Sequence, residues 1–194
     1  FTRLHAGGKF SKEGGEGAYS FAGGLHGVGV SVTNALSDSL VIEVVREGGL
    51  HRLAFSNGVV VEPLTRVRDM PATQSGTKVT VKPNPKYFDS PSIPVSELEL
   101  LVRSKAILLP GLKVYFVNEK TGDKKEWHYA DGLSSYLDEV TFDAENIGPV
   151  IAGQRFVAAS DETFTAGEGA AWALRWSTAG NLVRQSYVNL IPTH

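Results

Sequence analysis

The sequence predicts an α+β fold, in which strands that pair as hairpins alternate with a few short helices. Three stretches alternate apolar and polar residues with the two-residue period of a half-buried strand: residues 40–46, 50–56 and 78–82. Two others, residues 28–36 and 96–109, repeat apolar residues at helical spacing. From about residue 142 onward only strand patterns occur, which indicates that a second region built of strands follows the first.

The first helix is expected to begin directly after a run of glycines. Val28, Val32 and Leu36 recur at i, i+4 and i+8, with Ala35 beside them, so we expect them to line one face of this helix. Ser31 and Asn34 fall outside that stripe and are expected to point away from it.

Turn sequences separate the strands that follow. Glu47-Gly48-Gly49 lies between the first two strands and is typical of a hairpin. Asn57-Gly58 predicts a second turn, into a third strand at residues 59–61. Residues 63–76, which contain two prolines, are expected to form a loop before the fourth strand. Four prolines in residues 83–94 predict an irregular connection.

A longer helix is expected after these prolines. Ser96, with Glu99 three residues later, is a capping box that predicts where the helix begins. Pro110-Gly111 predicts where it stops. The residues expected on its buried face are Leu98, Leu101, Val102 and Leu109.

A further hairpin and a short helix complete this part of the chain. The hairpin is expected to pair residues 112–117 with residues 124–129. Asp131 is expected to cap the helix that follows. The residues that share one face of this helix are Leu133, Tyr136, Leu137 and Val140. Beyond it, three strands are expected at residues 152–158, 170–176 and 182–190.

The composition excludes some classes of site. The chain has 194 residues, of which 42% are apolar and 21% charged, as in an ordinary soluble domain. Its formal net charge of -2 gives no overall attraction to nucleic acid. With no cysteine it has neither disulfides nor thiolate metal sites, which suits a reducing cytoplasm. No apolar run is long enough to span a membrane. Because the first residue is Phe1, we expect an internal fragment.

The glycines before the first helix are a candidate phosphate site. Gly24, Gly27 and Gly29 have the spacing G-x-x-G-x-G. Glycines let backbone N–H groups approach a ligand closely, and a helix start carries unpaired donors. A Walker loop is excluded because Val30 and Ser31 follow the last glycine, and the dinucleotide fingerprint lacks its third glycine. A flexible turn remains the alternative.

Two blocks of sequence together are more specific than this spacing. They are Leu4-His5-Ala6-Gly7-Gly8-Lys9-Phe10 and the run from Gly23 to Ser37, which reads GGLHGVGVSVTNALS. They resemble the ATP lid and the third ATP-binding motif of the B subunits of bacterial type II DNA topoisomerases, which are GHKL ATPases. Further matches are Ser75-Gly76-Thr77-Lys78-Val79, Asp131-Gly132-Leu133 and residues 186–193. Phe88-Asp89-Ser90-Pro91 and Leu108-Leu109-Pro110-Gly111 look more like topoisomerase IV than gyrase.

The resemblance implies a domain organisation. Residues 1–141 would be the C-terminal part of a GHKL (Bergerat-type) ATPase domain, with a mixed sheet and helices on one face. Within it, residues 5–24 would form the ATP lid and residues 23–29 the phosphate loop. Residues 142–194 would begin the transducer domain, which has a ribosomal-protein-like fold.

The resemblance also implies the residues that contact ATP. Lys9 would reach the phosphates, Tyr19 the adenosine and Thr77 the adenine. The phosphate loop would contact the β- and γ-phosphates through Gly23, Gly24, Leu25, His26, Gly27, Val28 and Gly29. The residues alone also allow other readings: a solvated charge for Lys9, a loop anchor for Tyr19 and a strand former for Thr77.

The catalytic chemistry of the family needs residues that this chain lacks. No Glu is followed by Asn four residues later, and no Asp begins a D-x-G-x-G motif. We therefore expect no catalytic residue and no Mg²⁺ ligand within these residues, and no ATP hydrolysis by this chain alone.

The resemblance implies partners as well as a cofactor. The parent protein would use ATP and Mg²⁺, dimerise on ATP through its B subunits, and act on double-stranded DNA. It would do so with an A subunit in an A2B2 heterotetramer, without a membrane.

Alternatives remain at this point. Gyrase B is the nearest; MutL proteins, sensor histidine kinases and chaperones of the ninety-kilodalton class are further GHKL members. A non-catalytic RNA-binding module would need a basic face, but residues 142–194 hold only three cations, Arg155, Arg175 and Arg184.

Overall fold

The computed structural model describes residues 1–5, 27–90, 92–160, 163–180 and 182–193. The chain forms two compact units, which divide between Ile93 and Pro94. The two units are distinguished by how the backbone packs. This division does not test the predicted domain border at residues 141–142, which stays a prediction. Each unit is described by itself.

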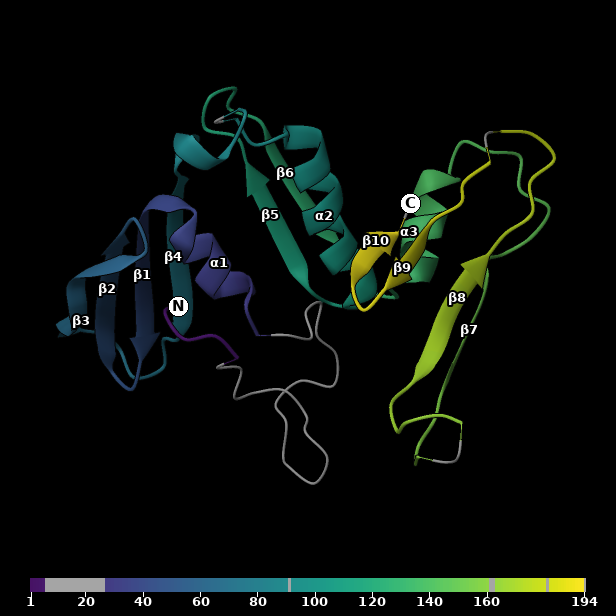
Figure 1. The fold of residues 1–194 in the computed structure, drawn as a ribbon. Helices are drawn as coiled ribbons and strands as arrows, with labels where there is room; N and C mark the ends of the chain where they lie inside the picture. The colour runs from purple at the N-terminus through teal and green to yellow at the C-terminus, as the bar shows by residue number, and fades with distance from the viewer. Residues whose placement is uncertain (6–26, 91, 161–162, 181, 194) are drawn as a thin grey trace. The chain divides into compact units, whose positions relative to one another are not determined.

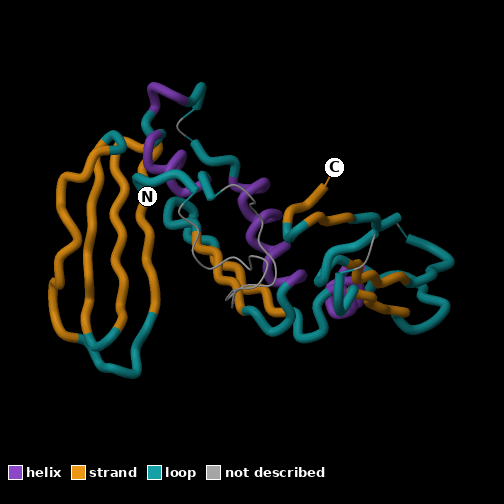
Figure 2. The backbone as a smooth tube through the Cα atoms, turned by 60° about the horizontal axis from the view of Figure 1, so that its bottom comes forward, coloured by secondary structure: helices purple, strands orange, loops and turns teal. Residues whose placement is uncertain are grey.

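The first unit is a four-stranded antiparallel sheet with one short helix (Figures 1 and 2). The helix is α1 (Gly29–Ala35), and the strands are β1 (Ser37–Arg46), β2 (Gly49–Ser56), β3 (Val59–Asp69) and β4 (Gly76–Pro83). The strand order is β3-β2-β1-β4, so β3 and β4 form the two edges. A short 3₁₀ helix (Pro85–Tyr87) follows β4.

Both predicted turns of this sheet are confirmed. Arg46 lies opposite Gly49, so Glu47 and Gly48 are the two residues of the β1–β2 turn. Their φ angles are 52° and 72°. Asn57 and Gly58, with φ of 48° and 79°, make the β2–β3 turn in the same way. Two consecutive positive φ values match the right-handed twist of a hairpin, and the Asn and Gly residues of these turns tolerate them best.

The loop predicted from residue 63 onward is wrong over its first part, because β3 continues through Pro63 to Asp69. Proline is tolerated there since β3 is an edge strand, and a register shift falls at this point. Arg52 pairs with Thr65 and Ala54 with Glu62, so β3 carries an extra residue opposite β2. A bulge on an edge strand does not need the N–H that proline lacks.

The core of the first unit lies between β1 and β2. Leu40, Ile42 and Phe55 are buried, and Val44 and Leu53 pack against them. These residues alternate along their strands, as the two-residue period predicts.

The apolar stripe of α1 is not its most buried face. Asn34 is buried and Val32 is 46% exposed. The Asn34 side chain Nδ2 donates to the carbonyl oxygens of Phe1 (3.2 Å) and Gly58 (3.4 Å). The helix passes so close to the β2–β3 turn that a Cβ on Gly58 would lie 3.4 Å from the Cα of Ala35. These backbone partners turn Asn34 inward, against the apolar periodicity.

The second unit joins two helices to three two-stranded antiparallel sheets (Figure 1). In chain order its elements are α2 (Val95–Leu108), β5 (Lys113–Val117), β6 (Lys124–His128), α3 (Leu133–Val140), β7 (Ile151–Phe156), β8 (Gly169–Leu174), β9 (Ser186–Val188) and β10 (Ile191–Thr193). The α+β class is confirmed. All pairings of the described strands are antiparallel, so the mixed sheet implied by the resemblance is not found among them.

Both helices exist as predicted, but their predicted caps are wrong. α2 begins at Val95, one residue before Ser96, and no side chain caps it. Gly132, rather than Asp131, is the N-cap of α3. The backbone N–H of Asp131 donates instead to the Ser135 hydroxyl at 3.0 Å. The expected face of α2 is only partly buried, since Leu101 is 43% exposed.

The strand predicted over residues 182–190 is shorter than expected and is followed by a turn. β9 and β10 form a tight hairpin, whose turn residues Asn189 and Leu190 have φ of 47° and 70°. The Lys105 ammonium of α2 donates to the carbonyl oxygen of Leu190. A branched residue such as leucine rarely adopts a positive φ, so the sequence carried no signal for this turn.

The core of the second unit lies between α2 and α3. Ala106, Ile107, Tyr129 and Tyr136 are buried together. The Arg103 Nε donates to the Tyr129 hydroxyl at 2.9 Å, and its guanidinium lies 5.0 Å from the centre of the Tyr136 ring. A cation over an aromatic face is attracted to it, so Arg103 links the two tyrosines.

Tyr129 makes the stability of this core sensitive to alkali. Burial, assisted by the nearby Glu139 carboxylate, raises the pKa of Tyr129 to about 12. Between pH 10 and 12 the folded protein keeps this proton while the unfolded chain releases it. The free energy of unfolding therefore falls as pH rises through that window, by about 2 kcal/mol for this group.

The Tyr129→Phe variant is expected to lose this contribution to the pH dependence. Urea unfolding at pH 9 and pH 11 measures it, with Tyr115→Phe as a control because Tyr115 is 65% exposed. Equal pH slopes for the Tyr129→Phe variant and the wild type would contradict the assignment.

Candidate nucleotide site

Four of the ten predicted contact residues lie in the described part of the chain. They are Gly27, Val28, Gly29 and Thr77. The other six lie outside the described residues: Lys9, Tyr19, Gly23, Gly24, Leu25 and His26. The roles of all ten stay predictions.

The backbone at Gly27 and Gly29 has the properties that a close ligand contact needs. Gly27 has φ of 62°, in the left-handed region that glycine adopts most readily. A Cβ built on Gly29 would have no atom within 4 Å, so the space beside it is open. Val28 is the N-cap of α1, and no side chain caps this helix. The free N–H groups of its first turn can therefore donate hydrogen bonds to a ligand.

The C-terminal end of α1 is held by the sheet. The Asn84 N–H donates to the Leu36 carbonyl oxygen at 2.9 Å, and the Ser37 hydroxyl donates to that of Thr33 at 2.5 Å. Within the described residues, the buried Asn34 Oδ1 has no hydrogen-bond partner. These contacts fix the C-terminal end of the helix.

Thr77 lies at the start of β4, opposite Val44 of β1, and is exposed. The bond between Leu36 and Asn84 joins the C-terminal ends of α1 and β4. Gly29 and Thr77 lie at the other, N-terminal ends of these two elements. No hydrogen bond of the described residues joins Thr77 to residues 27–29.

A metal site is not formed by the described residues. Among them there is no group of three or more His, Cys, Asp or Glu side chains placed to hold a metal ion. Carboxylate ligands are what Mg²⁺ prefers.

Known proteins match nearly the whole chain, although no family model matches it. The B subunit of DNA topoisomerase 4 from Haemophilus influenzae is 46% identical over 193 residues, which cover 99% of this chain and 29% of that protein. The chain belongs to the family of type II topoisomerase B subunits. The resemblance drawn from the two glycine-rich blocks is thus confirmed at the level of the family.

Solved structures of type II topoisomerase B subunits share the fold. The 43K ATPase domain of Thermus thermophilus gyrase B, solved with an aminocoumarin, has a TM-score of 0.72 and 32% identity; the match covers 86% of this chain and 43% of that one. The topoisomerase IV ATP-binding domain of Francisella tularensis, solved with a small-molecule inhibitor, has a TM-score of 0.61 and 30% identity. That match covers 98% of this chain and 45% of the other.

The chain spans under a third of the length of the Haemophilus influenzae protein and less than half of each solved domain. Of the helices in the described ranges, none has the length and apolar character needed to cross a membrane.

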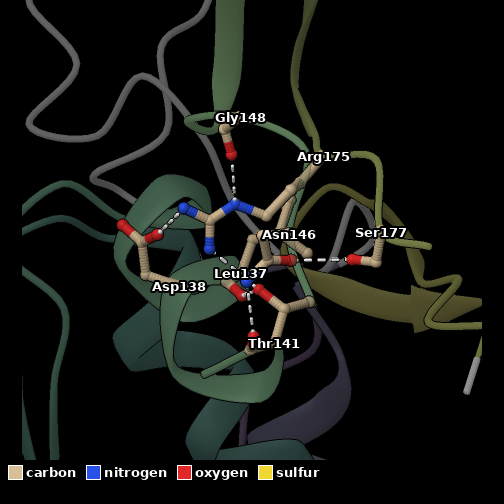
Figure 3. A network of polar contacts seen from close by, with 7 residues as sticks. All are labelled: Leu137, Asp138, Thr141, Asn146, Gly148, Arg175 and Ser177. Carbon is tan, nitrogen blue, oxygen red and sulfur yellow. Dashed lines mark hydrogen bonds and ion pairs between the residues drawn. The ribbon is translucent and has the colours of Figure 1, made fainter. Parts of the chain in front are cut away.

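The sequence patterns gave no indication of a polar network around Arg175. Figure 3 shows Arg175 between the end of α3 and the segment that follows it. In the sequence this residue counted only as one of three cations of residues 142–194. Its partners lie 27 to 37 positions away, at Gly148, Thr141 and Asp138, so no local pattern indicates them.

Proposed function

We propose that this chain is part of the B subunit of topoisomerase IV, an ATP-hydrolysing enzyme that passes one DNA duplex through another. The observation that carries the proposal is 46% identity to the DNA topoisomerase 4 protein of Haemophilus influenzae over 193 residues. The reaction would relax and decatenate DNA in the cytoplasm. It would require an A subunit, in an A2B2 heterotetramer, and dimerisation of the B subunits on ATP.

Within this function, residues 23–29 would hold the β- and γ-phosphates of ATP through main-chain N–H groups. The positive φ of Gly27 and the open space beside Gly29 support this role. Lys9 would reach the phosphates, while Tyr19 and Thr77 would contact adenosine and adenine. Phosphoryl transfer depends chiefly on positioning and charge, so such a cradle contributes by fixing the phosphates.

The domain border at residue 141 is part of the same proposal. Residues 1–141 would belong to the ATPase domain and residues 142–194 to the transducer. Mg²⁺ would be bound by residues other than those described here. Since the net charge is -2, contacts to DNA would come from a local patch or from other parts of the enzyme.

The B protein of DNA gyrase is the second candidate. It is favoured by the TM-score of 0.72 with the Thermus thermophilus gyrase B domain, which is higher than that with the topoisomerase IV domain. The two functions differ in their product, because gyrase introduces negative supercoils whereas topoisomerase IV relaxes and decatenates.

The test is reconstitution of the full-length B subunit with its A subunit. With ATP and Mg²⁺, decatenation of linked DNA circles without negative supercoiling is expected. Supercoiling of relaxed plasmid would favour gyrase, and the absence of both would refute the proposal. Residues 1–194 alone are expected to show no ATP turnover, because no Glu of this chain has Asn four residues later.

A further inference from the structure

Arg175, directly after β8, uses its whole guanidinium group to contact the end of α3 and the segment after it (Figure 3). Its Nη2 forms an ion pair with Asp138 Oδ1 at 2.9 Å, and its Nη1 donates to the Thr141 hydroxyl at 3.0 Å. Its Nε donates to the carbonyl oxygen of Gly148 at 3.1 Å. One side chain thus joins residues on both sides of residue 141.

A second set of bonds lies beside the first. The Asn146 Nδ2 donates to the Thr141 carbonyl oxygen at 2.8 Å, and the Ser177 hydroxyl donates to Asn146 Oδ1 at 2.7 Å. Figure 3 shows both bonds next to Arg175. The main chain adds two bonds, from Ile147 N to Trp176 O (3.0 Å) and from Thr178 N to Glu145 O (2.9 Å). The residues after β8 are therefore tied to the segment that leaves α3.

Arg175 is the central member because of its burial and shape. Only 15% of its side chain is exposed, whereas Asp138 is 58% exposed. The guanidinium is planar and presents its donors in a fixed fork, so three acceptors in different directions fix its orientation. Its positive charge also lies at the C-terminal end of α3, where a cation is favourable. Lysine, with one ammonium, would satisfy only part of this arrangement.

We propose that Arg175 is a positioning residue that holds α3 and the β7–β8 hairpin in one orientation, so that a displacement of α3 is passed to the strands. The hairpin also contacts α3 on its own. Removing Arg175 therefore loosens the junction without detaching it. This inference rests on the proposed function, in which ATP acts on residues before 141 and the strands lie after it.

The experiment uses the full-length B subunit with its A subunit, in wild-type, Arg175→Leu, Arg175→Lys and Lys125→Gln forms. Lys125 is the matched control, since its ion pair with Glu99 (2.7 Å) joins β6 to α2 and does not cross residue 141. The measurements are DNA-independent ATP hydrolysis and the number of decatenation events per ATP. Hydrogen exchange of the Ile147 and Thr178 amides reports on the junction itself.

For Arg175→Leu we expect ATP hydrolysis within about twofold of wild type and decatenation events per ATP reduced about tenfold, a typical size for coupling between sites. The number of decatenation events per ATP for Arg175→Lys is expected to lie between those of wild type and Arg175→Leu. Lys125→Gln is expected to match wild type. A parallel loss of hydrolysis and decatenation, an unchanged ratio for Arg175→Leu, or an equal effect of Lys125→Gln would overturn the inference.

The outcome remains decisive if the proposed function fails. A wild-type enzyme without ATP hydrolysis or strand passage would refute the proposed function. The positioning role of Arg175 would then be judged from hydrogen exchange alone. Exchange at Ile147 and Thr178 that is about tenfold faster in Arg175→Leu than in Lys125→Gln would support the positioning role, because exchange follows local opening. Equal exchange rates would overturn it.

Discussion

Gly29→Val is expected to abolish ATP binding by the full-length protein while leaving its fold intact. A Cβ at Gly29 meets no protein atom within 4 Å, so the substitution creates no clash in the protein itself. It fills space that the proposed site leaves for the phosphates. We expect affinity to fall by about 100-fold or more, since each hydrogen bond to a charged group contributes about 1.5–3 kcal/mol.

Isothermal titration calorimetry with a non-hydrolysable ATP analogue measures this loss. Gly76→Val is the matched control: Gly76 opens β4, and a Cβ there also meets nothing within 4 Å. Gly27→Val is expected to abolish binding too, but it would strain a backbone with φ of 62° and so is less specific. Unchanged affinity of Gly29→Val for the analogue would remove the phosphate role from this loop.

The sequence predicts those parts of the fold that depend on local geometry. Gly48, Asn57 and Gly58 are residues that accept positive φ, and both turns lie where they were expected. The hairpin of β5 and β6 and the apolar face of α3 around Tyr136 follow from periodicity in the same way.

Features set by distant partners could not be predicted. Asn34 faces inward because the carbonyl oxygens of Phe1 and Gly58 lie there, 33 and 24 residues away. Pro63 fits β3 only because that strand is at an edge of the sheet with a register shift, which is a property of the pairing with β2. Periodicity contains no information about either.

The candidate site likewise has features that local sequence indicates and features that depend on distant partners. The glycine spacing indicates where a phosphate could approach, and the left-handed φ of Gly27 is the local feature that glycine permits. Any ligand contact of Thr77 depends on which end of β4 lies beside which end of α1. The arrangement of the sheet decides this, and a local sequence pattern does not. The partners of Arg175 are likewise fixed by how β8 returns to α3, as Figure 3 shows.

Among alanine substitutions of Gly122, Gly132 and Gly148 in the second unit, Gly132→Ala is expected to cause the largest loss of stability. Gly132 has φ of 56° and ψ of -119°, a combination that disfavours any residue with a Cβ. A Cβ there would also lie 2.9 Å from the Ile107 carbonyl oxygen and 3.1 Å from Pro110 Cγ. Backbone strain and overpacking each cost about 1–3 kcal/mol, so we expect a loss of about 3–4 kcal/mol.

Two other glycines separate these two causes. Gly122 has φ of 80° with nothing within 4 Å of a Cβ, so Gly122→Ala should show strain alone, about 1 kcal/mol. Gly148 has open space and no positive φ, so Gly148→Ala should have little effect. Urea unfolding followed by tryptophan fluorescence, to which Trp127 on the α2–α3 core contributes, measures all three. If Gly132→Ala were no worse than Gly122→Ala, the close contact between the end of α2 and the start of α3 would not constrain this core.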